Sequence, residues 1–240
     1  MLNSKNQVSV IIPVHNPPLH WEESTLEHIV ALQTLLAEYK FHFILINDGS
    51  PMNVIRKLRK KLDKVQIRHS IYHLPENLGK GKALRTGLLK AAQNSSYYIC
   101  VDWDFPFGIT PIQSILEELA GGADVVLVDR GNEYLRKLPA SRSWLTRLWR
   151  IFIRKYLGLD LPDTQGGLKG LSHKAQQVAV QGTINSFLSD LELILLCRRH
   201  KLQIKTVKAY LRGGVRLASF SLSVYFRELK SLLEILKKLQ

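Results

Sequence analysis

Apolar runs typical of buried strands alternate with segments of helical periodicity over the first 130 residues. The run Val8–Val14 (VSVIIPV) is apolar at nearly every position, as in a strand buried on both faces of a parallel sheet. A stripe of apolar residues at helical spacing then extends from Trp21 to Tyr39. The same alternation predicts further strands at 41–46, 66–74, 97 onward and 124–129, and further helices at 55–62, 77–94 and 111–119. It favours an α/β fold built on a mostly parallel, doubly wound sheet with helices on both faces.

The second half of the chain is less regular. The pattern predicts a helix at 141–156, a glycine-rich connection at 158–170, a helix at 190–200, a strand at 205–211 and an amphipathic helix at 220–239. The sequence contains no internal repeat and no clear linker. We therefore expect one main domain at residues 1–215, followed by a C-terminal helical extension at 216–240.

Two aspartates follow the strand in the stretch Tyr97–Phe107 (YYICVDWDFPF). In an extended chain residues i and i+2 point to the same face, so Asp102 and Asp104 are expected to lie side by side. Neighbouring carboxylates need a cation, a hydrogen-bond network or a shared proton. Mg²⁺ or Mn²⁺ would suit them, because hard divalent ions bind carboxylates together with substrate phosphates. The plain alternative is a strand end whose exposed aspartates precede a turn.

Other polar residues fall at predicted strand ends, where doubly wound sheets bind their ligands. Together with the two aspartates, they are Asn16, Asp48 and Arg130. Asp48 is suited to accept hydrogen bonds from a base or a ribose, or to cap the helix that follows Pro51. The turn Asn77–Gly81 resembles an anion-binding helix N-terminus, although Asn77 as an N-cap in a tight turn explains it equally well. The Walker A and Rossmann glycine patterns are both absent.

The net charge of +14 is the unusual property of the composition. It indicates an anionic partner such as nucleic acid, an anionic membrane surface or a phosphorylated substrate, or else a generally basic surface. Because no zinc-finger, aromatic RNA-binding or basic-tail motif accompanies the charge, nucleic acid is not expected. Cys100 and Cys197 lie in apolar runs and are expected to be buried thiols in a reducing compartment. Without a signal segment or an apolar run of ~20 residues, the chain is expected in the cytoplasm.

A series of motifs, taken together, resembles the family 2 glycosyltransferases of the GT-A fold. Within that family it most resembles the polyprenyl-phosphate (dolichyl-phosphate) mannose and glucose synthases. The resemblance extends from about Val8 to Leu211, and it depends on the order and spacing of the motifs more than on any single one. The segment DTQGGLK is the most specific, since it is similar to a DTQCGFK-type motif of that subgroup. The motifs are VSVIIPVHN, FILINDGSP, NLGKGKALRTG, YYICVDWD, ADVVLVDR, LGLDLPDTQGGLKG and SDLELILLCRRHKLQI.

The resemblance implies an inverting enzyme that moves a hexose from a UDP- or GDP-sugar to an acceptor, either a polyprenyl phosphate or a glycan. It implies a divalent metal, Mg²⁺ or Mn²⁺, held mainly by Asp104 with Asp102 beside it. It assigns catalytic roles to Asp104, Asp163, Gln165 and Glu192. It assigns substrate binding to Pro13, His15, Asp48, Lys82, Arg85, Asp102, Trp103, Arg130, Arg142, Lys169 and Asp190. In this set Pro13, His15 and Asp48 would hold the nucleoside, Arg130 and Arg142 would meet phosphates, and Asp163, Gln165 and Lys169 would approach the sugar or acceptor.

Three departures from the family pattern bear on activity. Asn16 is followed by Pro17 where the family usually has glutamate, Pro106 stands where a glutamine often helps to bind the metal, and GGLK lacks the usual cysteine and phenylalanine. A non-catalytic or degenerate sugar-nucleotide-binding scaffold of the same fold is therefore the main alternative. A nucleotidyltransferase is less favoured, because HNPP and not a glycine-rich basic loop follows the first strand.

A lipid acceptor would give the positive charge a use. The segment 141–156 combines tryptophans with arginines, a composition that suits the bilayer interface. The C-terminal helix suits the interface, core packing or a homodimer contact. We expect peripheral binding to the inner face of an anionic membrane, in the synthesis of cell-envelope glycans.

Overall fold

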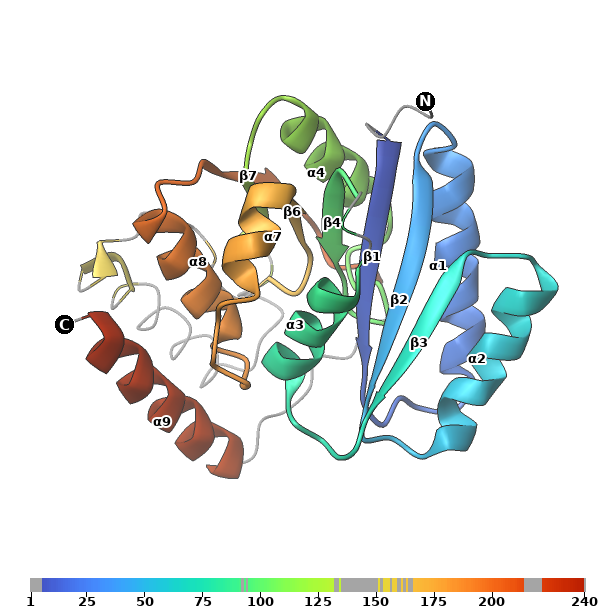
Figure 1. Cartoon of the computed structure of the whole chain (residues 1–240), viewed down its shortest axis with the longest axis horizontal. Coiled ribbons are helices and arrows are strands. Elements are labelled where there is room, and N and C mark those ends of the chain that lie inside the picture. The colour runs from blue at the N-terminus through green and yellow to red at the C-terminus, as the bar shows by residue number, and fades with distance from the viewer. Residues whose placement is uncertain are drawn as a thin grey trace.

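The computed structural model describes residues 6–91, 93, 95–131, 134, 151, 153–155, 157, 158, 161, 163, 166–213 and 222–239 (Figure 1). Its centre is a seven-stranded sheet with the strand order β3-β2-β1-β4-β6-β5-β7. β6 runs antiparallel to both of its neighbours, while the other pairs of strands are parallel. The strands are β1 (Gln7–Val14), β2 (Lys40–Asp48), β3 (His69–Leu74), β4 (Tyr97–Cys100), β5 (Val125–Asp129), β6 (Lys169–Ser172) and β7 (Ile204–Lys208). The predicted α/β fold with a mostly parallel sheet is confirmed.

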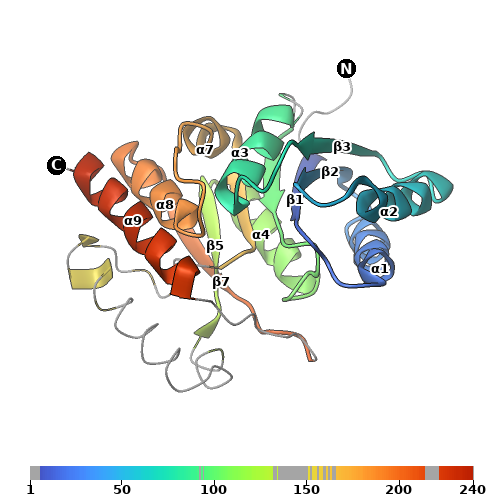
Figure 2. The same cartoon turned by 90° about the horizontal axis from the view of Figure 1, so that it is seen from below.

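Helices cover both faces of the sheet, as expected for a doubly wound fold (Figure 2). α1, α2 and α4 pack on one face over a core that includes Val10, Ile29 and Ile115. α3, α7 and α8 pack on the other face over a core that includes Ile11, Leu84 and Ile194. The helices are α1 (Trp21–Leu35), α2 (Met52–Lys64), α3 (Lys80–Lys90), α4 (Thr110–Ala120), α7 (His173–Ala179), α8 (Ser189–Arg199) and α9 (Leu222–Leu239).

The main difference from the expected element order lies at residues 169–179. The end of the predicted glycine-rich connection forms the interior strand β6, and α7 follows it directly. β6 fits here because Gly170 has no side chain, since a Cβ atom at this position would lie 2.2 Å from Cγ2 of Ile115 on α4. Elsewhere the differences are at element ends. The predicted helix at 141–156 lies almost entirely outside the described residues.

The C-terminal helix α9 packs against the segment that leads into α8 (Figure 2). The Ser186 hydroxyl donates a hydrogen bond of 2.9 Å to the Ser231 hydroxyl, and a Glu228 carboxylate oxygen accepts one of 3.1 Å from the Leu188 amide. Ile235 is only 3% exposed and belongs to the core on the α8 side of the sheet. These contacts fit the core-packing role considered for this helix. The domain boundary at residues 215 and 216 stays a prediction.

Among the helices that the structure describes, none has both the length and the apolar content needed to cross a bilayer.

Both cysteines are buried free thiols, as their apolar surroundings predict. Burial raises the pKa of Cys100 to about 11 and that of Cys197 to about 12.

We therefore expect neither thiol to react with an exchange reagent near pH 8 until the protein unfolds. Because the unfolded thiols ionise at lower pH than the folded ones, each should lower the free energy of unfolding by about 1.4 kcal/mol per pH unit above ~pH 9. Urea titrations of the parent and of Cys197→Ala at ~pH 8 and ~pH 10.5 test this. An equal decrease in both proteins would contradict it.

Candidate active site

The carboxyl ends of β1, β2 and β4 lie at one edge of the sheet (Figure 1). The segment that follows β4 carries the two aspartates and forms a turn, in which the Phe105 amide donates a hydrogen bond of 3.0 Å to the Asp102 carbonyl. The expectation that this segment is extended is therefore wrong. Phe105 adopts a φ of 43°, which is uncommon for a bulky residue, and its fully buried ring stacks on His28 of α1 at 5.2 Å. Packing against α1 thus holds a strained turn in place.

Two further contacts fix the backbone of this turn. Arg212, which follows β7, donates hydrogen bonds of 2.8 Å to the Phe105 carbonyl and 2.6 Å to the Asp104 carbonyl. The Thr25 hydroxyl donates one of 2.9 Å to the Trp103 carbonyl, and the Trp103 ring packs edge-on against Trp21. The predicted residue Trp103 therefore contacts α1. Arg212 was not predicted, because its approach to the turn depends on the position of β7 in the sheet.

A lysine that sequence reasoning did not select holds Asp102. The Lys80 ammonium, at the first residue of α3, lies 2.6 Å from Oδ1 of Asp102. Burial by itself raises the pKa of Asp102, but Lys80, and then Lys169, lower it by more, so its net pKa lies below the ordinary range. Burial likewise acts to lower the pKa of Lys80, but Asp102 and Asp190 outweigh it and raise that pKa. The pair is therefore an ion pair at neutral pH.

Asp104 has a different environment, although it lies only two residues away. Burial, and then the charge of Asp102, raise the pKa of Asp104. Within the described part of the chain, no ion pair neutralises its carboxylate. A carboxylate whose charge is disfavoured by burial and by a neighbouring carboxylate is stabilised by a nearby cation. Mg²⁺ is usually bound through one or two carboxylates together with substrate phosphates. The donor set of Asp104 and Asp102 therefore fits a divalent ion of this kind. Pro106 is buried and offers no side-chain ligand.

Two more pairs of opposite charge lie on the β5–β6 side of the cluster. The Arg130 guanidinium, just after β5, makes a two-pronged contact with the Asp163 carboxylate and covers the Tyr134 ring, 3.9 Å from its centroid. The Lys169 ammonium, on β6, lies 2.5 Å from Oδ1 of Asp190 at the start of α8, with the Lys169 side chain only 1% exposed. The structure thus gathers three cations and four carboxylates: Lys80, Arg130, Lys169, Asp102, Asp104, Asp163 and Asp190.

The end of β2 is tied to the turn that precedes α3. The Asp48 carboxylate accepts hydrogen bonds from the amides of Leu78 at 2.8 Å and Gly79 at 3.1 Å. His15, after β1, contacts the Asp48 carbonyl through Nδ1 and the Asn77 amide group through Nε2. Asp48 is therefore not the side-chain cap of α2, which was one of its two expected roles. Its predicted contact with a nucleoside, together with those of His15 and of the half-buried Pro13, stays a prediction.

Glu192 and Arg85 hold the loop that precedes α8. The Glu192 carboxylate accepts hydrogen bonds from the Thr183 amide and hydroxyl and from the Ile184 amide. The Arg85 guanidinium donates to the Ile184 carbonyl at 2.5 Å and also contacts the Asn185 side chain. A small, partly open pocket of about 30 Å³ lies beside them, lined also by Cys100, Lys169 and Asp190. The geometry therefore gives Glu192 and Arg85 a positioning role, whereas the catalytic and substrate-binding roles predicted for them remain untested.

The remaining predicted residues lie outside the cluster or outside the described residues. Lys82 is exposed on α3, pointing away from the face that carries Lys80, and its predicted role in substrate binding stays a prediction. Arg142 and Gln165 are not among the described residues.

A mostly parallel sheet with charged side chains outside the carboxyl ends of its strands is typical of α/β proteins, which as a class bind ligands at that edge. Residues 9–178 match the model of glycosyl transferase family 2, and the chain belongs to this family. The resemblance to family 2 glycosyltransferases expected from the motifs is confirmed.

Two curated relatives are similar to most of this chain. Glycosyltransferase AglD of Haloferax volcanii is 25% identical over 200 residues, which cover 80% of this chain and 31% of the relative. The dolichyl-phosphate beta-glucosyltransferase ALG5D of Trichomonas vaginalis is 23% identical over 223 residues, which cover 83% of this chain and 64% of the relative. The chain thus spans less than two thirds of the length of either relative.

Solved structures share the fold. Glucosyl-3-phosphoglycerate synthase of Mycobacterium tuberculosis, in complex with Mn²⁺, UDP-glucose and phosphoglyceric acid, superposes with a TM-score of 0.65 at 17% identity, covering 96% of this chain and 79% of that one. The mannosyltransferase PcManGT of Pyrobaculum calidifontis, in complex with GDP-mannose and Mn²⁺, gives a TM-score of 0.65 at 15% identity, covering 96% and 63%. The predicted GT-A fold is confirmed.

Proposed function

We propose that this chain is an inverting glycosyltransferase that moves a hexose from a UDP- or GDP-sugar to an acceptor. The observation that carries the proposal is the environment of Asp104. In a chain of glycosyl transferase family 2, this carboxylate lies beside the Lys80–Asp102 ion pair at the carboxyl edge of the sheet, and no described residue forms an ion pair with it. A sugar nucleotide brings a diphosphate to such an edge, and its charge requires a cation there.

A divalent metal would be held by Asp104, with Asp102 beside it and substrate phosphates completing the coordination. When bound, Mg²⁺ or Mn²⁺ would neutralise the negative charge that develops on the diphosphate leaving group. The fold neighbours crystallised with Mn²⁺ and a sugar nucleotide support this assignment.

The protein would contribute positive charge and a fixed geometry. Lys80 and Arg130, which pair with Asp102 and Asp163, would supply positive charge to the proposed diphosphate, and Arg212 holds the backbone of the Asp104 turn. In the transfer step an acceptor oxygen forms a bond to the anomeric carbon while the bond to the diphosphate oxygen breaks. A phosphate acceptor is already anionic near neutral pH, so no strong general base is needed.

The acceptor is proposed to be a polyprenyl phosphate at an anionic membrane surface, with a glycan as the alternative. The name of the Trichomonas vaginalis relative, a dolichyl-phosphate glucosyltransferase, supports this choice, and so does the net charge of +14. Liposome sedimentation at low and high salt tests the membrane part. Binding to anionic vesicles that weakens with salt supports it, and equal failure to bind at both salt concentrations rejects it.

A thermal-shift panel of UDP- and GDP-sugars, with and without Mn²⁺, tests the donor. One nucleotide sugar should raise the melting temperature in a metal-dependent way, and the same compound should support transfer to a polyprenyl phosphate. Nucleotide binding without metal dependence or transfer would favour the non-catalytic scaffold. The absence of any shift with any nucleotide sugar would reject both the glycosyltransferase and the sugar-nucleotide-binding scaffold.

Gly167 provides a second test, because its backbone lies directly against the Lys80–Asp102 pair. A Cβ atom at residue 167 would lie 2.2 Å from Oδ2 of Asp102 and 3.2 Å from the Lys80 ammonium nitrogen. We expect Gly167→Ala to displace the Asp102 carboxylate and to lower transfer by about tenfold or more, since a misplacement of ~1 Å has a large effect on rate. Gly213→Ala is the matched control, because no atom lies within 4 Å of the added Cβ. Equal activity of the two variants would contradict the placement of Asp102 in the site.

A further inference from the structure

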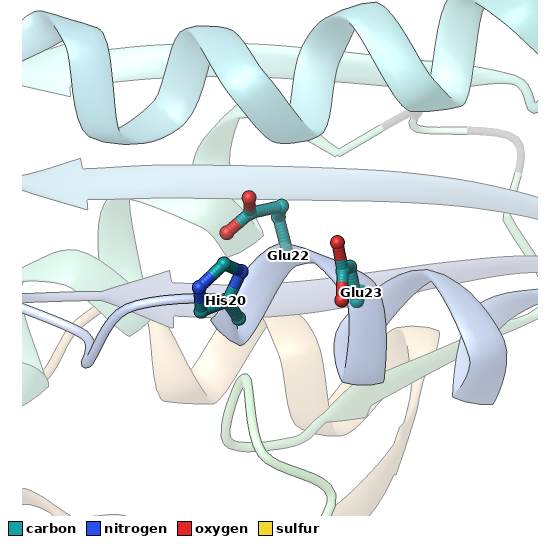
Figure 3. Close-up of side chains that lie close together, drawn as sticks. All are labelled: His20, Glu22 and Glu23. Carbon is teal, nitrogen blue, oxygen red and sulfur yellow. The ribbon is translucent and has the colours of Figure 1, made fainter.

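Three potential metal ligands, none of them part of the turn that carries Asp102 and Asp104, lie together at the start of α1 (Figure 3). One ligand atom from each of His20, Glu22 and Glu23 can be chosen so that all three atoms lie within 4.8 Å of one another. Figure 3 shows the Glu22 carboxyl group turned toward the His20 ring, with Glu23 on the neighbouring position of the helix. An imidazole nitrogen and two carboxylates form a ligand set common for first-row divalent metals.

Glu22 is the residue that points to a missing ligand. It is only 5% exposed, and among the described residues no hydrogen bond or ion pair reaches its carboxylate. A largely enclosed carboxylate without a protein partner is a favourable ligand for a cation placed between Glu22 and its two neighbours. The remaining ligands are exposed, which leaves a path by which the ion can enter.

The first turn of a helix favours glutamates even without a metal, because the helix dipole stabilises negative charge there. That effect accounts for the presence of two glutamates in the first turn of α1 but not for His20. His20 is the N-cap of α1 with a φ of 62°, and its ring makes no capping hydrogen bond to the helix. The ring of His20 is exposed and makes no capping contact, so it is available to a ligand.

Glu23 already has a cationic partner. The Lys61 ammonium lies 3.1 Å from Oε1 of Glu23 and donates a hydrogen bond to it. This contact competes with a metal. Lys61 thus limits how tightly a cation can be held.

We propose that His20, Glu22 and Glu23 form a second divalent-cation site, suited to a first-row transition metal such as Zn²⁺, with water at the remaining coordination positions. The site is separate from Asp104 and does not depend on the proposed sugar transfer. Its ligands flank Trp21, whose ring packs on Trp103 in the turn of the two aspartates. A bound ion would therefore restrain the start of α1, where Trp21 contacts that turn.

The test is a Co²⁺ and Zn²⁺ titration of the full chain in an Asp104→Asn background, which removes the other expected metal site. Co²⁺ should give a saturable visible d–d absorption, and Zn²⁺ should displace it. His20→Asn and Glu22→Gln should each weaken the affinity by at least about tenfold, because even outer-shell partners change it by 10- to 100-fold. Lys61→Met should instead tighten binding, since it removes the competing cation from Glu23.

Two matched controls separate this site from adventitious binding. Glu27→Gln changes an exposed glutamate further along α1, and His200→Asn changes an exposed histidine at the end of α8. Both should bind Co²⁺ like the background protein. The proposal is overturned if folded His20→Asn, checked by circular dichroism, binds Co²⁺ as tightly as the background. It is also overturned if Lys61→Met leaves the affinity unchanged, a result that does not depend on the stability of the other variants.

Discussion

Replacing Asp104 with asparagine should abolish metal-dependent sugar transfer without destabilising the protein. The side chain keeps its size but loses the carboxylate that would hold the metal against the leaving diphosphate. Loss of one preorganised electrostatic contact commonly lowers turnover by about 10²–10³-fold, and loss of a metal ligand should do at least as much. Burial and the charge of Asp102 both raise the pKa of Asp104, so the folded protein gains nothing from its charge. The free energy of unfolding should therefore stay the same or rise.

Turnover with Mn²⁺ and urea unfolding, measured on the same preparations, test this prediction. Asp102→Asn is the informative comparison, because it leaves the Lys80 ammonium without its partner and should lose stability as well as activity. Asp63→Asn, on α2 near Arg59 and 3.6 Å from Nε2 of His69, lies away from the proposed site and should leave turnover unchanged. An Asp104→Asn protein that retains more than about a tenth of the parent turnover would remove Asp104 from the metal site.

β1 and β2 could be predicted because both strands are continuous apolar runs that need no distant partner to be recognised. β1 and β2 are buried along almost their whole length, and the sequence pattern places both of them. β6 has no such pattern. It is four residues long and includes a lysine and a glycine, and Lys169 is buried there because Asp190 approaches from α8. A contact between residues so far apart in the chain leaves no periodic signal in the sequence.

The site could be predicted where it depends on strand ends, and less well where it depends on the rotation of a helix. Asp102 and Asp104 lie at the expected edge of the sheet, whereas Lys82 was selected in place of Lys80. Residues two apart on a helix point about 200° apart, so only one of these lysines can face the sheet. Lys80 shares its face with Leu84 and Leu88, which are both buried. This i, i+4, i+8 spacing was present in the sequence and identifies Lys80 as the inward lysine.

Replacing Lys169 with methionine should destabilise the protein more than any other single change considered for this cluster. Its ammonium is almost fully buried and pairs with Asp190, whose side chain is 10% exposed. Methionine retains most of the side-chain volume and removes only the charge, so Asp190 would be left as a buried carboxylate without its nearest cation. Breaking a buried pair in this way typically costs about 3–5 kcal/mol. We expect the free energy of unfolding, measured with urea, to decrease by that amount.

The double variant Lys169→Met/Asp190→Leu shows whether the loss comes from the stranded charge. A buried pair replaced by apolar residues of similar size is often neutral or stabilising, so the double variant should recover most of the loss. Lys205→Met is the matched control, since Lys205 lies 2.7 Å from Glu118 with about the same spacing as the buried pair but with both side chains more than a third exposed. It should cost less than about 1 kcal/mol. A double variant as unstable as Lys169→Met alone would mean that Lys169 stabilises the sheet through packing and not through its charge.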